Sequence, residues 1–161
     1  MKKLFLAMLI AFVSIGAFAQ ENKVSVGAQL SYGSDHERVG LGIKGQYGLI
    51  DNIRLEAAFN YFFKQNNVSL YDLNVNVHYV IPINEQFSVY PLAGLTYMKV
   101  SASAKGEGFK LSVSDSRLGA NLGVGAQYQL DSNWAIAGEL KYQIIKDMSQ
   151  LVPSIGVVYT F

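Results

Sequence analysis

The sequence predicts an all-β fold: an eight-stranded antiparallel up-and-down β-barrel that crosses a membrane. Three observations support this prediction. Apolar and polar side chains alternate along most of the chain after residue 19, which is the period of a strand with two different faces. Only 16% of the residues are charged, whereas a soluble surface is typically about 25–35% charged. The segment 154–161 also alternates and ends on the aromatic Phe161, although the ends of soluble chains usually fray into water.

Residues 1–19 have the features of an export signal. Lys2 and Lys3 give a positive start, an apolar run follows from Leu4 to Ile15, and the small residues around Phe18 form a cleavage site. We therefore expect a signal peptide over 1–19 and one β-barrel domain over 20–161. After residue 19, no apolar run of the sequence approaches the roughly 18–20 residues of a spanning helix, so the chain is expected to cross the membrane as strands.

Eight strands are predicted, each with one uncharged apolar face and one polar or glycine-rich face. Tilted strands of about 9–11 residues are long enough to cross a bilayer. We expect the apolar faces to point outward at lipid and the polar faces to point into the barrel. The predicted strands are 23–32, 39–49, 53–63, 69–80, 87–100, 116–130, 134–145 and 151–161.

The connections predict the orientation of the barrel. Short connections at 50–52, 81–86 and 131–133 alternate with four other loops, so we expect both termini and the short connections on the periplasmic side. Aromatic residues at the strand ends predict a girdle at each membrane interface. The outer girdle would contain Tyr32, Tyr61, Phe63, Tyr97 and Tyr142, and the inner one Tyr47, Tyr79, Phe87, Tyr128, Trp134, Tyr159 and Phe161.

A secreted barrel of lipocalin type, with its apolar face inward, is the soluble alternative. The strand count fits it equally well, but the low charge and the aromatic residues at strand ends favour the membrane orientation. The sequence contains no cysteine, which excludes disulfides and thiolate metal sites. Its near-neutral charge gives no electrostatic reason to expect nucleic-acid binding.

The strand pattern, together with one motif, resembles the OmpA/OmpX-like eight-stranded barrels of Gram-negative bacteria over about 20–161. The motif is their C-terminal assembly signal, which Ser154, Gly156, Tyr159 and Phe161 match position by position. The resemblance implies a porin-family-like protein of the cell outer membrane that contacts outer-membrane lipids. It also implies that the barrel-assembly machinery recognises these four residues.

Eight inward-facing residues predict a polar network in the lumen. Lys44 and Glu56 are expected to lie opposite or diagonal to one another, and Arg54 is expected near His78. An ion path is one interpretation. A filled polar core is favoured, because side chains can just fill the lumen of eight strands. The predicted network is Lys44, Arg54, Glu56, Asp72, His78, Arg117, Glu139 and Lys141.

The third long loop, 101–115, predicts a protruding hairpin. Its side chains continue to alternate on both sides of Gly106, Glu107 and Gly108, and Phe109 begins the return strand. Such strands can present unpaired edges to a surface ligand. A mobile Ser/Gly-rich loop is the alternative.

The resulting hypothesis is a monomeric outer-membrane protein with a structural or surface-interaction role and no cofactor. A narrow channel for small solutes is the alternative. A lipid A-modifying acyl enzyme is a third hypothesis, for which Ser34-Asp35-His36-Glu37 is the candidate segment, although turn chemistry explains it as well. We predict no catalytic or metal-binding residue. Pro91, which cannot donate to a strand ladder, predicts a local bulge.

Overall fold

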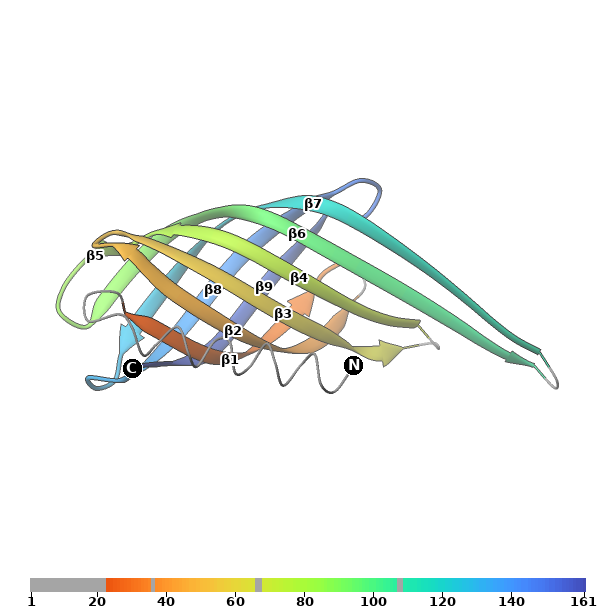
Figure 1. The fold of residues 1–161 in the computed structure, drawn as a ribbon, viewed down its shortest axis with the longest axis horizontal. Helices are drawn as coiled ribbons and strands as arrows, with labels where there is room; N and C mark the ends of the chain where they lie inside the picture. The colour runs from red at the N-terminus through yellow and green to blue at the C-terminus, as the bar shows by residue number, and fades with distance from the viewer. Residues whose placement is uncertain (1–22, 36, 66–67, 107–108) are drawn as a thin grey trace.

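Alternating side chains form long antiparallel strands that curve around a common axis (Figure 1). The computed structural model describes residues 23–35, 37–65, 68–106 and 109–161. Its strands are β1 (Val24–Gly33), β2 (Arg38–Ile50), β3 (Ile53–Gln65), β4 (Val68–Tyr79), β5 (Ile81–Pro82), β6 (Phe87–Gly106), β7 (Phe109–Gln129), β8 (Trp134–Ile145) and β9 (Gln150–Thr160).

The strands close into a barrel because the first strand pairs with the last. Each strand pairs with the next along the chain, and β1 pairs with β9 from Ser25↔Thr160 to Ser31↔Ser154. The short β5 continues β4, and both pair with β6. The barrel therefore has eight staves, as predicted, and closure removes the free edges that an open sheet would expose. Among the described residues, no helix is long and apolar enough to cross a membrane.

The two faces of each strand differ as the sequence predicts. Leu95 is 65% exposed, whereas its neighbour Thr96 points inward and is only 1% exposed. The same alternation leaves apolar side chains exposed around the outside and buries polar and charged side chains inside. A surface of this kind suits hydrocarbon, while the interior must satisfy its own polar groups.

Aromatic residues gather on the outside near the end with the short connections, which we call the turn end. Trp134 packs edge-on against Tyr159, with ring centroids 5.0 Å apart, and Tyr159 contacts Phe161 at 5.1 Å. Tyr79 and Tyr128 are also exposed at this end. Near the opposite end, exposed aromatic side chains include Tyr32, Tyr61, Phe63, Tyr97 and Tyr142.

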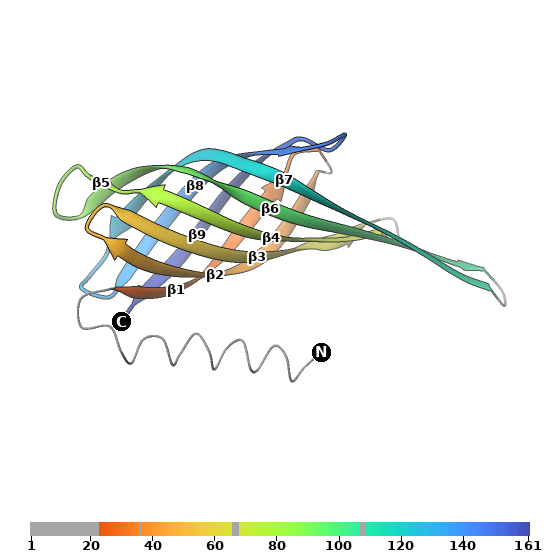
Figure 2. The same cartoon turned by 45° about the horizontal axis from the view of Figure 1, so that its top comes forward.

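At that opposite end, β6 and β7 extend well beyond their neighbours (Figures 1 and 2). Pairing of β6 with β4 stops at Ala102, and pairing of β7 with β8 stops at Gly119. The two strands remain paired with each other as far as Gly106↔Phe109. We call residues 103–106 and 109–118 the arm, and this end of the barrel the arm end. Glu107 and Gly108 lie outside the described residues.

The predicted bulge at Pro91 is wrong. The pairs His78↔Leu92 and Ile81↔Val89 share one register, so no residue is inserted beside Pro91. Because Pro91 has no N–H to donate, the hydrogen-bond ladder is interrupted between the β4–β6 and β5–β6 pairs instead. Val80, at this break, donates its N–H to the Asn52 carbonyl at 2.7 Å.

Candidate functional site

A buried ionic cluster occupies the lumen toward the turn end. The Lys44 ammonium donates to Glu139 Oε1 at 2.7 Å and lies 3.3 Å from Glu56 Oε2. Lys141 Nζ lies 3.3 Å from the other oxygen of Glu139. These four side chains come from β2, β3 and β8 and are almost completely buried. Because an unpaired buried charge is very costly, this pairing is a condition for the fold.

Tyr90 connects this cluster to the side chains of His78 and Arg54. Its hydroxyl donates to Glu139 Oε1 at 3.0 Å. The His78 ring stacks on the Tyr90 ring at 4.6 Å, and the Arg54 guanidinium carbon lies 4.8 Å from the centre of the same ring. Arg54 also donates to His78 Nδ1 at 3.2 Å and to Gln127 Oε1 at 2.8 Å. A cation over an aromatic face is electrostatically favourable.

Glu56, His78 and Glu139 have ligand atoms that all lie within 4.8 Å of one another. Such a set could in principle bind a metal ion. The Lys44 ammonium, however, already contacts both carboxylates. The chain thus supplies its own cation between these carboxylates, and the cluster is better suited to lysine than to a metal.

A second layer, made mainly of amides, lies nearer the arm end. The Asp72 carboxylate accepts hydrogen bonds from Asn60 at 2.7 Å, from Asn74 at 2.7 Å and from Gln143 at 3.1 Å. Asn121 donates across the lumen to Asn74 at 2.9 Å. These bonds join β3, β4, β7 and β8 through the interior, so the amide layer ties opposite walls together.

An apolar layer lies above the amides at the arm end. Phe62, Leu70, Met98 and Ile145 pack together there, and each is 1% exposed. Val100 and Met148 pack against them. Because this layer offers no polar partner to a hydrated ion, it opposes passage between the amide layer and the arm end.

The structure places seven of the eight predicted network residues in the lumen, and Arg117 elsewhere. Arg117 lies at the base of the arm, where Nε donates to Asp115 Oδ2 at 2.9 Å. Its Nη1 donates to the Lys146 carbonyl and lies 3.4 Å from an Asp147 carboxylate oxygen. The correction has a simple cause: the pairs between β7 and β8 begin at Gly119↔Ile145, two residues after Arg117 in the chain.

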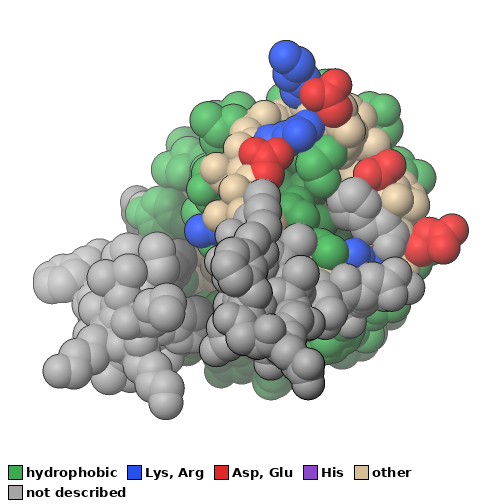
Figure 3. All heavy atoms as spheres, turned by 90° about the vertical axis from the view of Figure 1, so that its right-hand side faces the viewer, with side chains coloured by type: hydrophobic (Ala, Val, Ile, Leu, Met, Phe, Trp, Pro, Cys, Tyr) green, Lys and Arg blue, Asp and Glu red, His purple; other side chains and the backbone are tan. Residues whose placement is uncertain are grey.

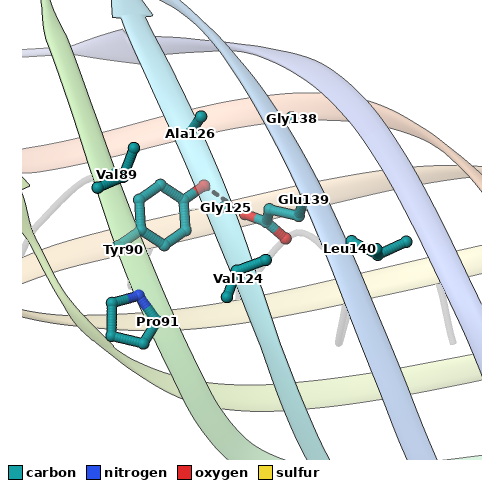
Figure 4. Close-up of a pocket in the computed structure, with 9 residues that line it drawn as sticks. All are labelled: Val89, Tyr90, Pro91, Val124, Gly125, Ala126, Gly138, Glu139 and Leu140. Carbon is teal, nitrogen blue, oxygen red and sulfur yellow. Dashed lines mark hydrogen bonds between the residues drawn. The ribbon is translucent and has the colours of Figure 1, made fainter.

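A shallow hollow of about 440 Å³ lies in the outer wall over β6, β7 and β8. Its floor includes Gly125, and on the inner side Tyr90 covers this glycine (Figure 4). A Cβ added to Gly125 would overlap the Tyr90 ring. Figure 4 also shows the Tyr90 hydroxyl directed at Glu139. The outward side chains around the hollow are apolar: Val89, Pro91, Val124, Ala126 and Leu140.

Ser34, the serine of the candidate acyl-transfer segment, is part of a loop contact. Its N–H donates to the Leu151 carbonyl at 3.0 Å, and its hydroxyl accepts from the Leu151 N–H at 2.9 Å. His36 lies outside the described residues. The hydroxyl therefore fastens the first loop to the start of β9.

The four residues of the assembly motif lie along β9 and just beyond it. Ser154 and Gly156 are on the inner face, where Gly156 lies between Gln29 of β1 and Ala137 of β8. Tyr159 and Phe161 belong to the aromatic cluster of the turn end. The Phe161 N–H donates to the Val24 carbonyl at 3.0 Å, which extends the closing seam between the two ends of the barrel.

Sequence reasoning did not identify Tyr90 or the apolar layer. Tyr90, Phe62, Leu70, Met98 and Ile145 all occupy inward positions of their strands. Their position in the alternation was a usable signal, since each is a large apolar or aromatic side chain on an otherwise polar face.

The family model of the outer membrane protein beta-barrel domain matches residues 5–161. No curated protein matches the chain. Among solved structures, the N-terminal barrel domain of Pseudomonas aeruginosa OprF is similar with a TM-score of 0.71 and 17% identity, over 86% of this chain and 97% of that one. Neisserial surface protein A has a TM-score of 0.70 and 18% identity, over 87% and 97%. Yersinia pestis Ail, the attachment invasion locus protein, has a TM-score of 0.65 and 22% identity, over 87% and 97%.

The chain belongs to the outer membrane protein beta-barrel domain family. It is an outer-membrane β-barrel protein, and its fold is similar to those of the three solved barrels named above.

Proposed function

We propose that this family member is a closed structural barrel that carries a surface-interaction arm. We also propose that residues 1–19 direct its export as a signal peptide and are then removed. The observation that carries the first half of the proposal is the filled lumen. Ion pairs, amide bonds and the apolar layer follow one another along the barrel axis. Eight staves leave only enough room for such side chains.

The test of the closed lumen is planar-bilayer recording with the purified mature protein. We expect no steady, large conductance. The double variant Phe62→Ala/Leu70→Ala removes large side chains from the apolar layer and serves as the comparison. We expect the conductance of the wild type to be lower than that of this variant. A reproducible porin-like conductance of the wild type would support the narrow-channel alternative instead.

The arm supports the surface-interaction half of the proposal. Residues 109–118 of β7 have no partner strand on the β8 side in the described structure. Backbone groups of such an edge can accept an extended segment of a partner protein. Ail, which has a similar fold, has been solved in complex with the heparin analogue sucrose octasulfate. The proposed interaction element includes Gly106, Glu107, Gly108 and Phe109, of which Glu107 and Gly108 lie outside the described residues.

Deleting 104–109 tests the arm. The deletion removes the tip and leaves the barrel ladders of β6 with β4 and of β7 with β8 intact. We expect binding of surface ligands or phage susceptibility to change while the protein still assembles. If neither property changes, the arm is not the interaction element.

The proposal includes no enzymatic role. Ser34, the candidate nucleophile, is hydrogen-bonded to the Leu151 backbone and holds the first loop closed. Lipid A mass spectrometry of cells with and without the protein checks this, with no change in acyl chains as the expected result. A change that disappears with His36→Ala would establish an acyl-transfer activity.

We also propose that Ser154, Gly156, Tyr159 and Phe161 are recognised by the barrel-assembly machinery and that the assembled barrel is monomeric. These residues lie on the seam between β1 and β9 that closes the barrel. This location supports their recognition by the machinery before the two strands pair. Replacing Phe161 by Ala should lower the yield of assembled barrel in the outer membrane, whereas the exposed Glu85→Ala at the same end should not.

A further inference from the structure

The aromatic residues at the arm end define the level of the membrane interface. Tyr97 faces outward on β6, and Tyr142 faces outward on β8. Tyrosine rings concentrate where acyl chains meet headgroups. Outward side chains one step closer to the arm therefore lie among lipid headgroups.

Two lysines occupy this level on the side of the barrel that carries the arm. Lys99 pairs with Tyr71 on one side and with Ser116 on the other, and it has the outward alternation of Leu95 and Tyr97. Lys146 follows the outward Ile144 and is exposed. The register Gly119↔Ile145 brings Lys146 beside the outer face of β7. Lys99 is opposite Ser116, and Lys146 follows the partner of Gly119, so the Cα atoms of the two lysines lie roughly 12 Å apart on either side of β7.

The backbone that carries Lys146 is held in place. Its carbonyl accepts a hydrogen bond from Arg117, and the Met148 N–H donates to the Ile145 carbonyl at 3.1 Å. Arg117 also binds Asp115 and Asp147, so these two acids are engaged beside the lysines. Within the described residues, neither lysine ammonium forms an ion pair of its own.

The side chains that surround the lysines suit an anion. Ser69, Ser101, Ser114 and Ser116 occupy outward positions on β4, β6 and β7 and offer hydroxyl donors. The acids beside the lysines, Asp115 and Asp147, are paired with Arg117, whereas Asp35 and Glu37 belong to the β1–β2 connection, which is across the barrel from β6 and β7. Figure 3 looks onto the arm end and shows the charged side chains gathered there, with hydrophobic side chains around the flank.

We infer that Lys99 and Lys146 form a binding site for a glycolipid with two phosphate groups in the outer leaflet, one lysine to each phosphate and the serine hydroxyls beside them. Lysine attracts phosphate as a compact point charge, and partial burial among headgroups strengthens the attraction. The spacing across β7 favours two phosphates on one headgroup over a single phosphate. The site lies at the base of the arm and fixes a lipid there independently of what the arm binds.

The test is a lipid titration of the detergent-solubilised barrel, followed by native mass spectrometry. The probes are diphosphoryl lipid A and phosphatidylglycerol. In the double variant Lys99→Ser/Lys146→Ser, we expect affinity for diphosphoryl lipid A to fall roughly 30-fold, since each lysine near a lipid surface contributes about fivefold. Lys23→Ser, which removes an exposed lysine at the turn end, is the matched control and should leave affinity unchanged.

The inference is overturned if the double variant binds diphosphoryl lipid A as tightly as the wild type, or if Lys23→Ser causes the same loss. It is also overturned if the wild type binds phosphatidylglycerol as tightly as diphosphoryl lipid A, because the lysines would then respond to surface charge alone. Deleting the arm tip at 104–109 should leave lipid binding intact, which separates this site from the proposed interaction element.

Discussion

The lumen and the arm share the strands β6 and β7 but are stabilised in different ways. In the barrel, inward side chains of these strands bond across the interior: Tyr90 reaches Glu139, and Asn121 reaches Asn74. In the arm, the same two strands pair with each other, and β7 lacks a neighbour on its β8 side in the described structure. The comparison indicates that stability resides in the interior contacts, whereas the arm contributes little to it.

The largest effect is expected from Glu139→Ala. This change leaves Lys44, Lys141 and the Tyr90 hydroxyl without their shared partner in a buried site. Breaking a buried ion pair from one side typically costs about 3–5 kcal/mol. Urea unfolding in lipid vesicles, followed by the fluorescence of the single tryptophan, measures the loss. Glu85→Ala, in an exposed turn, is the control; equal losses would contradict the importance of the ionic cluster.

A smaller loss is expected from Gly125→Ala. The new methyl group would overlap the Tyr90 ring, and overpacking of this kind costs about 1–3 kcal/mol. Gly138→Ala is a close match on the neighbouring strand, where the added Cβ would be 4.0 Å from its nearest neighbour, the Ser154 carbonyl. The same unfolding assay should therefore separate the two variants. Similar stabilities would mean that Tyr90 is not tightly seated on β7.

A turn residue should show a smaller effect that depends on pH. The exposed Asp131 carboxylate accepts hydrogen bonds from the N–H groups of Asn133 and Trp134, and these bonds lower its pKa. A lowered folded-state pKa adds stability above the unfolded pKa of about 3.9, and this stability is lost as pH falls through the folded value. Wild type and Asp131→Asn should differ in urea midpoint at pH 7, and this difference should shrink as the pH is lowered below about 3.9. A difference that grows on acidification would contradict the assignment.

The smallest effect on stability is expected from shortening the arm. Deleting 104–109 removes pairs between β6 and β7 only, so the free energy of unfolding should change by no more than about 0.5 kcal/mol. Urea unfolding of the deletion variant checks this. A loss comparable to that of Glu139→Ala would show that the arm supports the barrel and would remove the contrast between the two regions.

The strands and their faces could be predicted from the sequence because alternation is a local property. Contacts within one hairpin were also accessible, such as Arg54 with His78, which pair directly between β3 and β4. Contacts across the lumen were not, since Lys44 and Glu139 are 95 residues apart and only barrel closure brings them together. The sequence prediction placed Arg117 in the lumen for a related reason. Alternation predicts which face of a strand a residue occupies, but not the point along the barrel axis at which the strand separates from the barrel wall.

The continuity of β6 and β7 has a mechanical consequence. Both strands run without interruption from the turn end of the barrel into the arm. A pull on the arm is thus directed along the β4–β6 and β7–β8 ladders, whose hydrogen bonds lie perpendicular to the strands. Many of these bonds are loaded in shear at once instead of opening one after another. The wall of the barrel anchors the arm against force, so that a captured particle under flow would strain the partner contact before it strained the barrel.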